Sequence, residues 1–464
     1  MSTADLPHHD VEHPAKPGWQ LGFEAFMSEH PDLDTLEVIL PDTNGVLRGK
    51  WLPGSALRKV FEQGVAFPFS LFGLDVWGRE VEATELHIET GDKDGLCWPI
   101  PETLKLVPWV DRKTAQVLLS MYHRDGAPFF IDPRHVLERM ISRISDELGV
   151  TATCAFELEF YFFEESDGDW TEQPKPLFST HLGPARQNMY ALSDLEALLP
   201  VVDDLRAACE IQGIPADAAV SEAAPGQFEL NLHHRRNPLL AADDVVMLRR
   251  LVAGVARRHQ LKASFMAKPY VEWPGNGMHV HVSMEKGGKN IFAEGDKGRE
   301  RLGHAINGLL ETMPEALLLF TSTFNGFRRM QPGSYAPTSI CWGYDNRSVA
   351  LRVPASSPEA ARIEHRIAGA DANPYLVLTG ILAGMLEGLT AKVDPPAPVI
   401  GNAYEKKHKR LTPWMDEAID AFVDSERMKR AVGADMHKVL GEIKKEELNE
   451  FGREISALER QTYL

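Results

Sequence analysis

The segment "TATCAFELEFYFF", residues 151–163, carries two carboxylates inside an apolar run that is typical of a β-strand. Side chains alternate across a strand, so Glu157 and Glu159 point to one face while their apolar neighbours point to the other. Burying two like charges side by side is costly unless a cation lies between them. The segment therefore predicts either a strand that faces a cationic group or the solvated face of an antiparallel sheet.

Two further segments place carboxylates on predicted strands in the same way. "SEAAPGQFELNLHH" (221–234) has Glu222 before a Pro-Gly turn and Glu229 on the strand that follows. "ARIEHRIAG" (361–369) has Glu364 between two arginines, again with strand alternation. Each segment alone is equally compatible with a solvated sheet face, but the repetition indicates a shared site.

"PGNGMHVHVSM" (274–284) adds His279 and His281 on one strand face, either as site residues or as ordinary residues of a half-exposed strand. Carboxylate oxygens and imidazole nitrogens suit Mg²⁺ or Mn²⁺. Six side chains are enough for two divalent sites: Glu157, Glu159, Glu222, Glu229, Glu364 and His279.

Composition restricts the class of protein. The chain has 464 residues, which favours at least two domains, and its net charge of −18 argues against nucleic acid or an anionic membrane as the partner. The four cysteines are scattered, which fits a reducing, cytoplasmic setting and disfavours a structural zinc site. With no run of eighteen apolar residues and a polar N-terminus, we expect neither a membrane span nor a signal peptide.

The order of predicted elements divides the chain into three parts. Residues 1–20 are expected to form a disordered arm, and 21–120 a small strand-rich domain with a hairpin turn at Asn44-Gly45. Residues 121–464 alternate strands with helices, which indicates a large α/β or α+β domain. Its first helix, at 132–149, has an Asp cap, a following Pro and a terminal Gly.

Arginines gather downstream of the predicted strands. The segment 327–354 contains Arg328, Arg329, Arg347 and Arg352, and two more arginines flank Glu364. Arg makes bidentate contacts to carboxylate and phosphate, and metals beside arginines suit phosphoryl transfer. Walker, Rossmann and kinase signatures are absent from the sequence, so another fold must hold any nucleotide.

Six separated motifs agree in order and spacing with one family: "FELEF", "EAAPGQFEL", "KPYVEWPGNGMHVHVS", "NRSVALRVP", "RIEHR" and "DANPY". Over about residues 35–450 the chain resembles the glutamine synthetase superfamily. The resemblance implies an α+β fold, with an N-terminal β-grasp domain and a catalytic domain built on a curved antiparallel sheet flanked by helices. It also implies ATP and Mg²⁺ or Mn²⁺ as cofactors, and a dodecamer of two hexameric rings with active sites between neighbouring subunits.

The resemblance implies a role for each matching residue. The ligands of the metal nearer the amino-acid substrate are Glu159, Glu222 and Glu229. Those of the metal that bridges the ATP phosphates are Glu157, His279 and Glu364. His281 contacts phosphate and Ser283 lies near the nucleotide. Gly275, Arg329 and Arg366 bind glutamate. Arg347 and Arg352 neutralise the transferring phosphoryl group, and Arg352 also contacts ATP.

Two departures from the family pattern bear on the amine substrate. Tyr335 stands where an ammonia-using enzyme has a glutamate, and Pro68 stands where it has an aspartate. An aromatic pocket with Phe67, Phe69, Phe72, Trp77 and Tyr335 suits an alkylammonium ion. The chain therefore most resembles the γ-glutamylpolyamine synthetase (glutamate–putrescine ligase) branch. Glu222 is a candidate for the base that deprotonates the amine, and so is Asp75 if its loop reaches the site.

The expected reaction is ATP-dependent formation of a γ-glutamyl amide from L-glutamate and putrescine or another polyamine, through γ-glutamyl phosphate. Three alternatives remain: an ammonia-using glutamine synthetase, a non-catalytic relative of the same fold, and, more remotely, a guanidino kinase. The complete set of candidate metal ligands disfavours the second, and the glutamate-binding motif disfavours the third.

Overall fold

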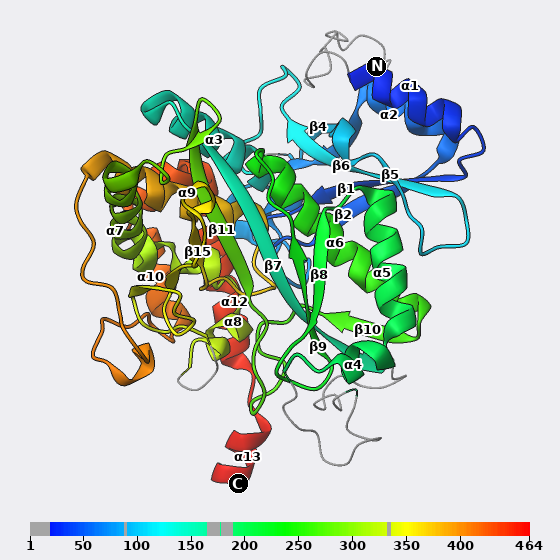
Figure 1. The fold of residues 1–464 in the computed structure, drawn as a ribbon. Coiled ribbons are helices and arrows are strands. Elements are labelled where there is room, and N and C mark those ends of the chain that lie inside the picture. The colour runs from blue at the N-terminus through cyan, green and yellow to red at the C-terminus, as the bar shows by residue number, and fades with distance from the viewer. Residues whose placement is uncertain (1–18, 88–90, 165–176, 178–188, 332–335) are drawn as a thin grey trace.

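The computed structural model describes residues 19–87, 91–164, 177, 189–331 and 336–464. Helix α1 (Trp19–Glu29) begins the described part, so most of the arm predicted at 1–20 lies outside it. Within the described residues, two sheets and a set of helices form the molecule (Figure 1).

A six-stranded sheet is formed by the N-terminal part of the chain, coloured blue to cyan in Figure 1. Its strands are β1 (Thr35–Pro41), β2 (Leu47–Pro53), β3 (Val65–Pro68), β4 (Asp94–Pro99), β5 (Lys105–Leu106) and β6 (Thr114–Tyr122). The order is β2-β1-β6-β4-β3, with β5 on β6, and β1 and β6 run parallel. The predicted Asn44-Gly45 turn joins β1 to β2, with Gly45 at a positive φ of 76°. Helix α2 (Leu57–Gln63) contacts α1 through Phe61, whose ring lies 5.4 Å from that of Trp19.

A nine-stranded sheet occupies the centre of the rest of the chain (Figure 1). Its strands are β7 (Thr151–Glu164), β8 (Ala216–Ser221), β9 (Gln227–Leu232), β10 (Leu261–Ser264), β11 (Met278–Lys286), β12 (Lys289–Asn290), β13 (Trp342–Tyr344), β14 (Leu351–Val353) and β15 (Ile363–His365). The order is β13-β14-β15-β11-β7-β9-β8, with β10 on β7 and β12 on β11. The α+β class is confirmed. The sheet differs from the expected all-antiparallel one only at β13 and β14, which run parallel.

Helices cover this sheet and pack beside it. They are α3 (Pro133–Leu148), α4 (Leu192–Ala197), α5 (Leu199–Gln212), α6 (Pro238–Arg258), α7 (Gly295–Phe320), α8 (Phe324–Arg329), α9 (Pro374–Ala391), α10 (Met415–Val423), α11 (Glu426–Val432), α12 (Ala434–Arg453) and α13 (Ala457–Tyr463). Helix α3 has the ends predicted from sequence. The Asp132 side chain accepts a hydrogen bond from Arg134 N, and Gly149 takes a left-handed φ of 65° after the last turn.

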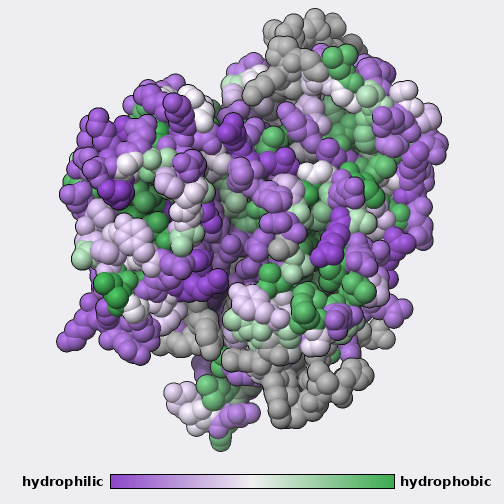
Figure 2. Space-filling view, viewed as in Figure 1, coloured by the Kyte–Doolittle hydropathy of each residue, from purple (hydrophilic) through white to green (hydrophobic). Residues whose placement is uncertain are grey.

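Helix α9 is long and apolar enough to cross a membrane by length and composition, but 83% of that window is buried inside the protein. It packs against α7 at close range, because a Cβ on Gly308 of α7 would lie 2.2 Å from the carbonyl oxygen of Gly384. Helix α9 is therefore a core helix. Hydrophilic side chains predominate on the outer face that Figure 2 shows, and hydrophobic ones are scattered among them.

Helix α12 connects the end of the chain to two N-terminal loops. Lys444 and Glu447, whose side chains are each 1% exposed, form an ion pair 2.7 Å long. Lys444 Nζ also donates to Asn44 Oδ1 at 2.5 Å, and Glu447 Oε1 accepts from Val76 N at 2.9 Å. This α12 ion pair therefore fixes the β1–β2 turn and the loop after β3 against α12.

Candidate active site

The predicted site residues converge because their strands are neighbours in the nine-stranded sheet. Cross-strand pairing places Glu157 of β7 opposite His279 of β11, and Glu159 opposite Glu229 of β9. Along β7, residues 155–160 alternate between half-buried and buried, as predicted for a strand with one polar face. The polar face is the one that carries the carboxylates, so the cation-facing interpretation is favoured over a solvated sheet face.

A cavity of about 420 Å³ lies over this face. Ten of the residues named from the sequence line it: Glu157, Glu159, Glu222, Glu229, Gly275, His279, Arg329, Arg347, Arg352 and Arg366. A second cavity, of about 540 Å³, is lined by Glu157, His281 and Ser283 together with Glu359 and Arg362. Glu157 lines both cavities, so they meet at β7. Tyr335 lies outside the described residues.

Three carboxylates in the first cavity repel one another. Burial and, after it, the neighbouring Glu159 together raise the pKa of Glu229 to about 9. Burial also raises the pKa of Glu159 to about 7, with Glu222 adding to the shift. The pKa of Glu222 is raised by burial as well, although nearby Arg347 opposes the shift. Such a cluster is short of positive charge, which a divalent cation would supply.

Glu157 is stabilised in its charged form by two histidines. His281 Nε2 lies 2.8 Å from Glu157 Oε1, and His279 Nδ1 lies 3.2 Å from Glu157 Oε2. Burial opposes ionisation of Glu157, but these hydrogen bonds outweigh it and lower its pKa. Because Arg362 Nε donates to His281 Nδ1 at 3.2 Å, the ring proton of His281 is on Nε2 and points at Glu157.

Glu364 is fully buried beneath the cavity and paired with two arginines. Arg352 Nη1 donates to Glu364 Oε2 at 2.8 Å, and Arg366 donates to Oε1. Burial disfavours the charge of Glu364, but the attraction to Arg366 outweighs this and lowers the pKa. Arg352 also donates to Asp345 Oδ1 at 2.8 Å, so its guanidinium is oriented from both sides.

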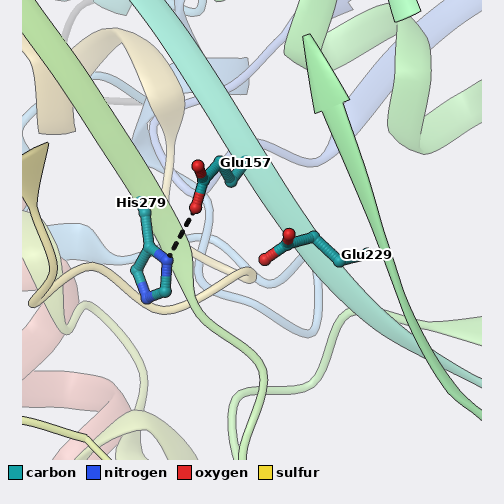
Figure 3. Close-up of side chains that lie close together, drawn as sticks. All are labelled: Glu157, Glu229 and His279. Atoms are coloured by element: carbon teal, nitrogen blue, oxygen red, sulfur yellow. Dashed lines mark hydrogen bonds and ion pairs between the residues drawn. The ribbon is translucent and has the colours of Figure 1, made fainter. Parts of the chain in front are cut away.

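Two groups of ligand atoms lie close enough to share an ion, with all atoms within 4.8 Å of one another. One is Glu157, Glu229 and His279, which converge from β7, β9 and β11 in Figure 3; the other is Glu157, His281 and Glu364. Both groups have donor atoms that suit Mg²⁺ or Mn²⁺, namely carboxylate oxygens and one imidazole nitrogen in each group. The division of ligands implied by the resemblance, in which Glu229 and Glu157 serve different metals, stays a prediction.

The glycine-rich turn before β11 lies against a buried arginine. Arg329, which is 4% exposed at the end of α8, donates to Ile367 O at 2.7 Å. A Cβ on Gly275 would lie 2.3 Å from Ala267 O, and one on Gly277 would lie 2.7 Å from Arg329 Nη2. A side chain at position 275 would clash with the backbone of Ala267, and one at position 277 would clash with Arg329. Glycine at both positions therefore allows this close approach, as expected for a turn that presents backbone groups to a small ligand.

Asp75 is hydrogen-bonded within its own loop. Its side chain is 1% exposed, and Oδ1 accepts from Trp77 N and Arg79 N at 2.9 Å each. Oδ2 accepts from Arg79 Nε at 2.8 Å. Both oxygens are therefore occupied and buried within this loop, and Asp75 is not among the residues that line the cavity. A role for Asp75 as the base stays a prediction, and Glu222 is the candidate within the cavity.

The aromatic pocket predicted around Pro68 is not part of the cavity in this chain. Phe67 and Phe72 are core residues, 4% and 0% exposed, and Phe69 packs on Phe129 with ring centroids 4.5 Å apart. Trp77 contacts Phe451 of α12 at 5.1 Å. Strand alternation cannot distinguish such core aromatics from a pocket wall, because both are apolar positions of the same elements.

Residues 130–463 match the family described as "Glutamine synthetase, catalytic domain". The chain belongs to the glutamine synthetase family. It is 37% identical over 437 residues to gamma-glutamylputrescine synthetase PuuA of Escherichia coli (strain K12), covering 94% of this chain and 92% of that one. It is 32% identical to glutamate–isopropylamine ligase of a Pseudomonas species, covering 86% and 88%. A solved structure titled "Apo GmaS without ligand" superposes with a TM-score of 0.81 at 25% identity, covering 95% and 98%.

Among the cavity residues that were not assigned to the site from the sequence are Tyr190, Gln227, Asn231 and Tyr404. Gln227 Nε2 donates to Gly275 O at 3.1 Å and so supports the glycine turn. Period two along β9 places Gln227 and Asn231 on the face of Glu229, a signal that was available in the sequence. The two tyrosines lie outside strands, where no periodicity marks them.

Proposed function

We propose that this chain is an ATP-dependent ligase that joins the γ-carboxylate of L-glutamate to a primary amine through γ-glutamyl phosphate. The products are a γ-glutamyl amide, ADP and phosphate. The observation that carries the proposal is the cavity in which a buried carboxylate cluster faces Arg329, Arg347, Arg352 and Arg366. The similarity to glutamate–amine ligases supports the amine as co-substrate.

Each charged group has a task in this scheme. Arg329 and Arg366 hold the carboxylates of glutamate, the turn at Gly275 contacts the same substrate, and Arg366 also orients Glu364. Arg347 and Arg352 stabilise the negative charge that develops on the transferring phosphoryl group. A bound Mg²⁺ or Mn²⁺ at Glu157, Glu229 and neighbouring ligands would neutralise phosphate charge. His281 and Ser283 line the second cavity, which we assign to the nucleotide.

The second step needs a base, because a primary alkylamine has a pKa of about 10 and arrives protonated. Glu222 lines the cavity and is the carboxylate that we assign to this proton transfer. The free amine then attacks the γ-glutamyl carbonyl carbon, phosphate leaves, and the amide bond is complete. We propose putrescine as the preferred amine, since the relative with 37% identity is a gamma-glutamylputrescine synthetase.

An ammonia-using glutamine synthetase is the second candidate function. The chain is also 32% identical to the glutamine synthetase of Pyrococcus horikoshii, covering 89% of this chain and 88% of that one. Phosphate release from ATP and glutamate, measured with putrescine, spermidine, isopropylamine and ammonia, distinguishes the two. Release with ammonia equal to or above that with every amine contradicts the proposal, and mass spectrometry identifies the amide formed.

We also propose a cytoplasmic dodecamer, as the family resemblance implies. Light scattering should return twelve times the 51.7 kDa mass of the chain. A smaller assembly that is still active contradicts this part alone.

A further inference from the structure

The active-site cavity is lined in part by large uncharged side chains that the proposed chemistry does not use. Its charged residues are assigned to glutamate, phosphate and metal. Three large uncharged side chains remain among the lining residues: Met189, Tyr190 and Tyr404. A straight-chain amine brings a hydrocarbon chain that needs such a surface, whereas ammonia brings none.

Tyr404 is fixed to the catalytic loop that carries Arg347. Asn346 Nδ2 donates to two backbone carbonyls of segment 399–404, at 3.2 and 2.8 Å. Ser348 Oγ accepts a backbone N–H of the same segment at 2.9 Å. Asn346 and Ser348 flank Arg347, so these hydrogen bonds connect the loop of the arginine to the segment of the tyrosine.

The segment is also anchored by packing. Val399 and Ala403 form a small buried cluster with Cys341 and Val349. Tyr404 itself follows an Asn402 cap, whose Oδ1 accepts from Tyr404 N at 3.0 Å. Its side chain is 38% exposed and lines the cavity that also contains Arg329 and Ala336. A ring that is held in place and still accessible from the cavity is available to a ligand.

We infer that Tyr404 contacts the hydrocarbon chain and distal ammonium of a straight-chain diamine and determines amine selectivity. This inference rests on the proposed ligase function. The chain packs on the ring, and an alkylammonium ion near an aromatic face is attracted by the ring quadrupole. The binding free energy that the ring contributes grows with the length of hydrocarbon chain that it contacts. Binding of diamines therefore depends on Tyr404, whereas binding of ammonia and methylamine does not.

The test is an amine panel assayed on three variants of the full-length protein. Tyr404→Ala should raise the KM for 1,4-diaminobutane by about tenfold, with methylamine, ATP and glutamate changed less than about twofold. Tyr404→Phe keeps the ring and should stay within about threefold of the wild type. Tyr344→Ala removes a 57% exposed tyrosine that does not line the cavity, and should behave as the wild type.

Four outcomes overturn the inference. A raised KM for glutamate with unchanged amine selectivity means that the ring covers Arg329. An equal loss of kcat/KM for all amines, methylamine included, means that Tyr404 is merely structural. Absence of amine-dependent turnover in the wild type refutes the proposed function itself, and the inference with it. Wild-type turnover with unaltered selectivity in Tyr404→Ala refutes the inference alone.

Discussion

The carboxylate cluster makes a quantitative prediction about the metal-free protein. Burial and Glu159 raise the pKa of Glu229 to about 9, from an ordinary value of 4.5 in the unfolded chain. Between these two values the folded protein binds a proton that the unfolded chain releases. Stability is therefore greatest at low pH and falls as pH rises through this window, by about 1.4 kcal/mol per pH unit and proton. Moving from pH 6 to pH 8 should cost the metal-free protein about 2.7 kcal/mol from Glu229.

Glu229→Gln should remove the contribution of Glu229, because an amide does not titrate, and should leave the smaller contribution of Glu159, whose pKa is raised to about 7. The measurement is urea unfolding of protein freed of metal by chelation, at pH 6 and pH 8 and at one protein concentration. At pH 8 the metal-free variant should be more stable than the metal-free wild type. Excess Mg²⁺ should restore the stability of the wild type at pH 8, because a deprotonated carboxylate binds the metal. It should stabilise Glu229→Gln less, because the amide replaces that ligand.

A matched control is Glu62→Gln, which neutralises a 53% exposed carboxylate on α2 and should leave the pH dependence unchanged. The reasoning is refuted if the metal-free wild type is as stable as Glu229→Gln at pH 8. It is equally refuted if the metal-free wild type gains stability, relative to this variant, between pH 6 and pH 8.

Three further substitutions test the structure elsewhere. Lys444→Met leaves Glu447 buried without its partner and should lower the free energy of unfolding in urea by about 3–5 kcal/mol. The double variant with Glu447→Leu should recover much of that loss. No recovery would argue against a buried charge as the cause. Gly254→Ala places a Cβ 2.4 Å from Trp109 Nε1 and should cost about 1–3 kcal/mol, seen as a lower melting temperature; an unchanged melting temperature would contradict this packing. Arg347→Ala should lower kcat by about 100-fold or more, with the KM for ATP little changed; a rise in KM at constant kcat would instead make Arg347 a ground-state binding residue.

Strand periodicity was enough to predict which side chains face the site. Glu157 and Glu159 were assigned to one face of a strand from alternation alone, and the structure has them there. The partners across the sheet were not predictable in this way. His279 lies opposite Glu157 from 122 residues further along the chain, and nothing local to either strand sets that register. Only the family resemblance placed the strands together.

For two loop residues, Asp75 and Tyr404, the surroundings were not predictable from the sequence. Asp75 was named as a candidate base, and the hydrogen bonds of its turn, which occupy both of its oxygens, could not be read from the sequence. Tyr404 was not assigned to the site from the sequence. Its place in the cavity depends on hydrogen bonds from Asn346 and Ser348, more than fifty residues away.

The α12 ion pair connects parts of the chain that are synthesised at different times. Val76 N and Glu447 Oε1, which it brings together, are separated by 371 residues. At synthesis rates of about 5–20 residues per second, the loop after β3 is made roughly 20–70 s before α12. During that interval Trp77 has no α12 to pack on, and Val76 N lacks its partner Glu447. A chain terminated before α12 would lack both contacts permanently, so α12 is the element that completes the anchoring of this loop.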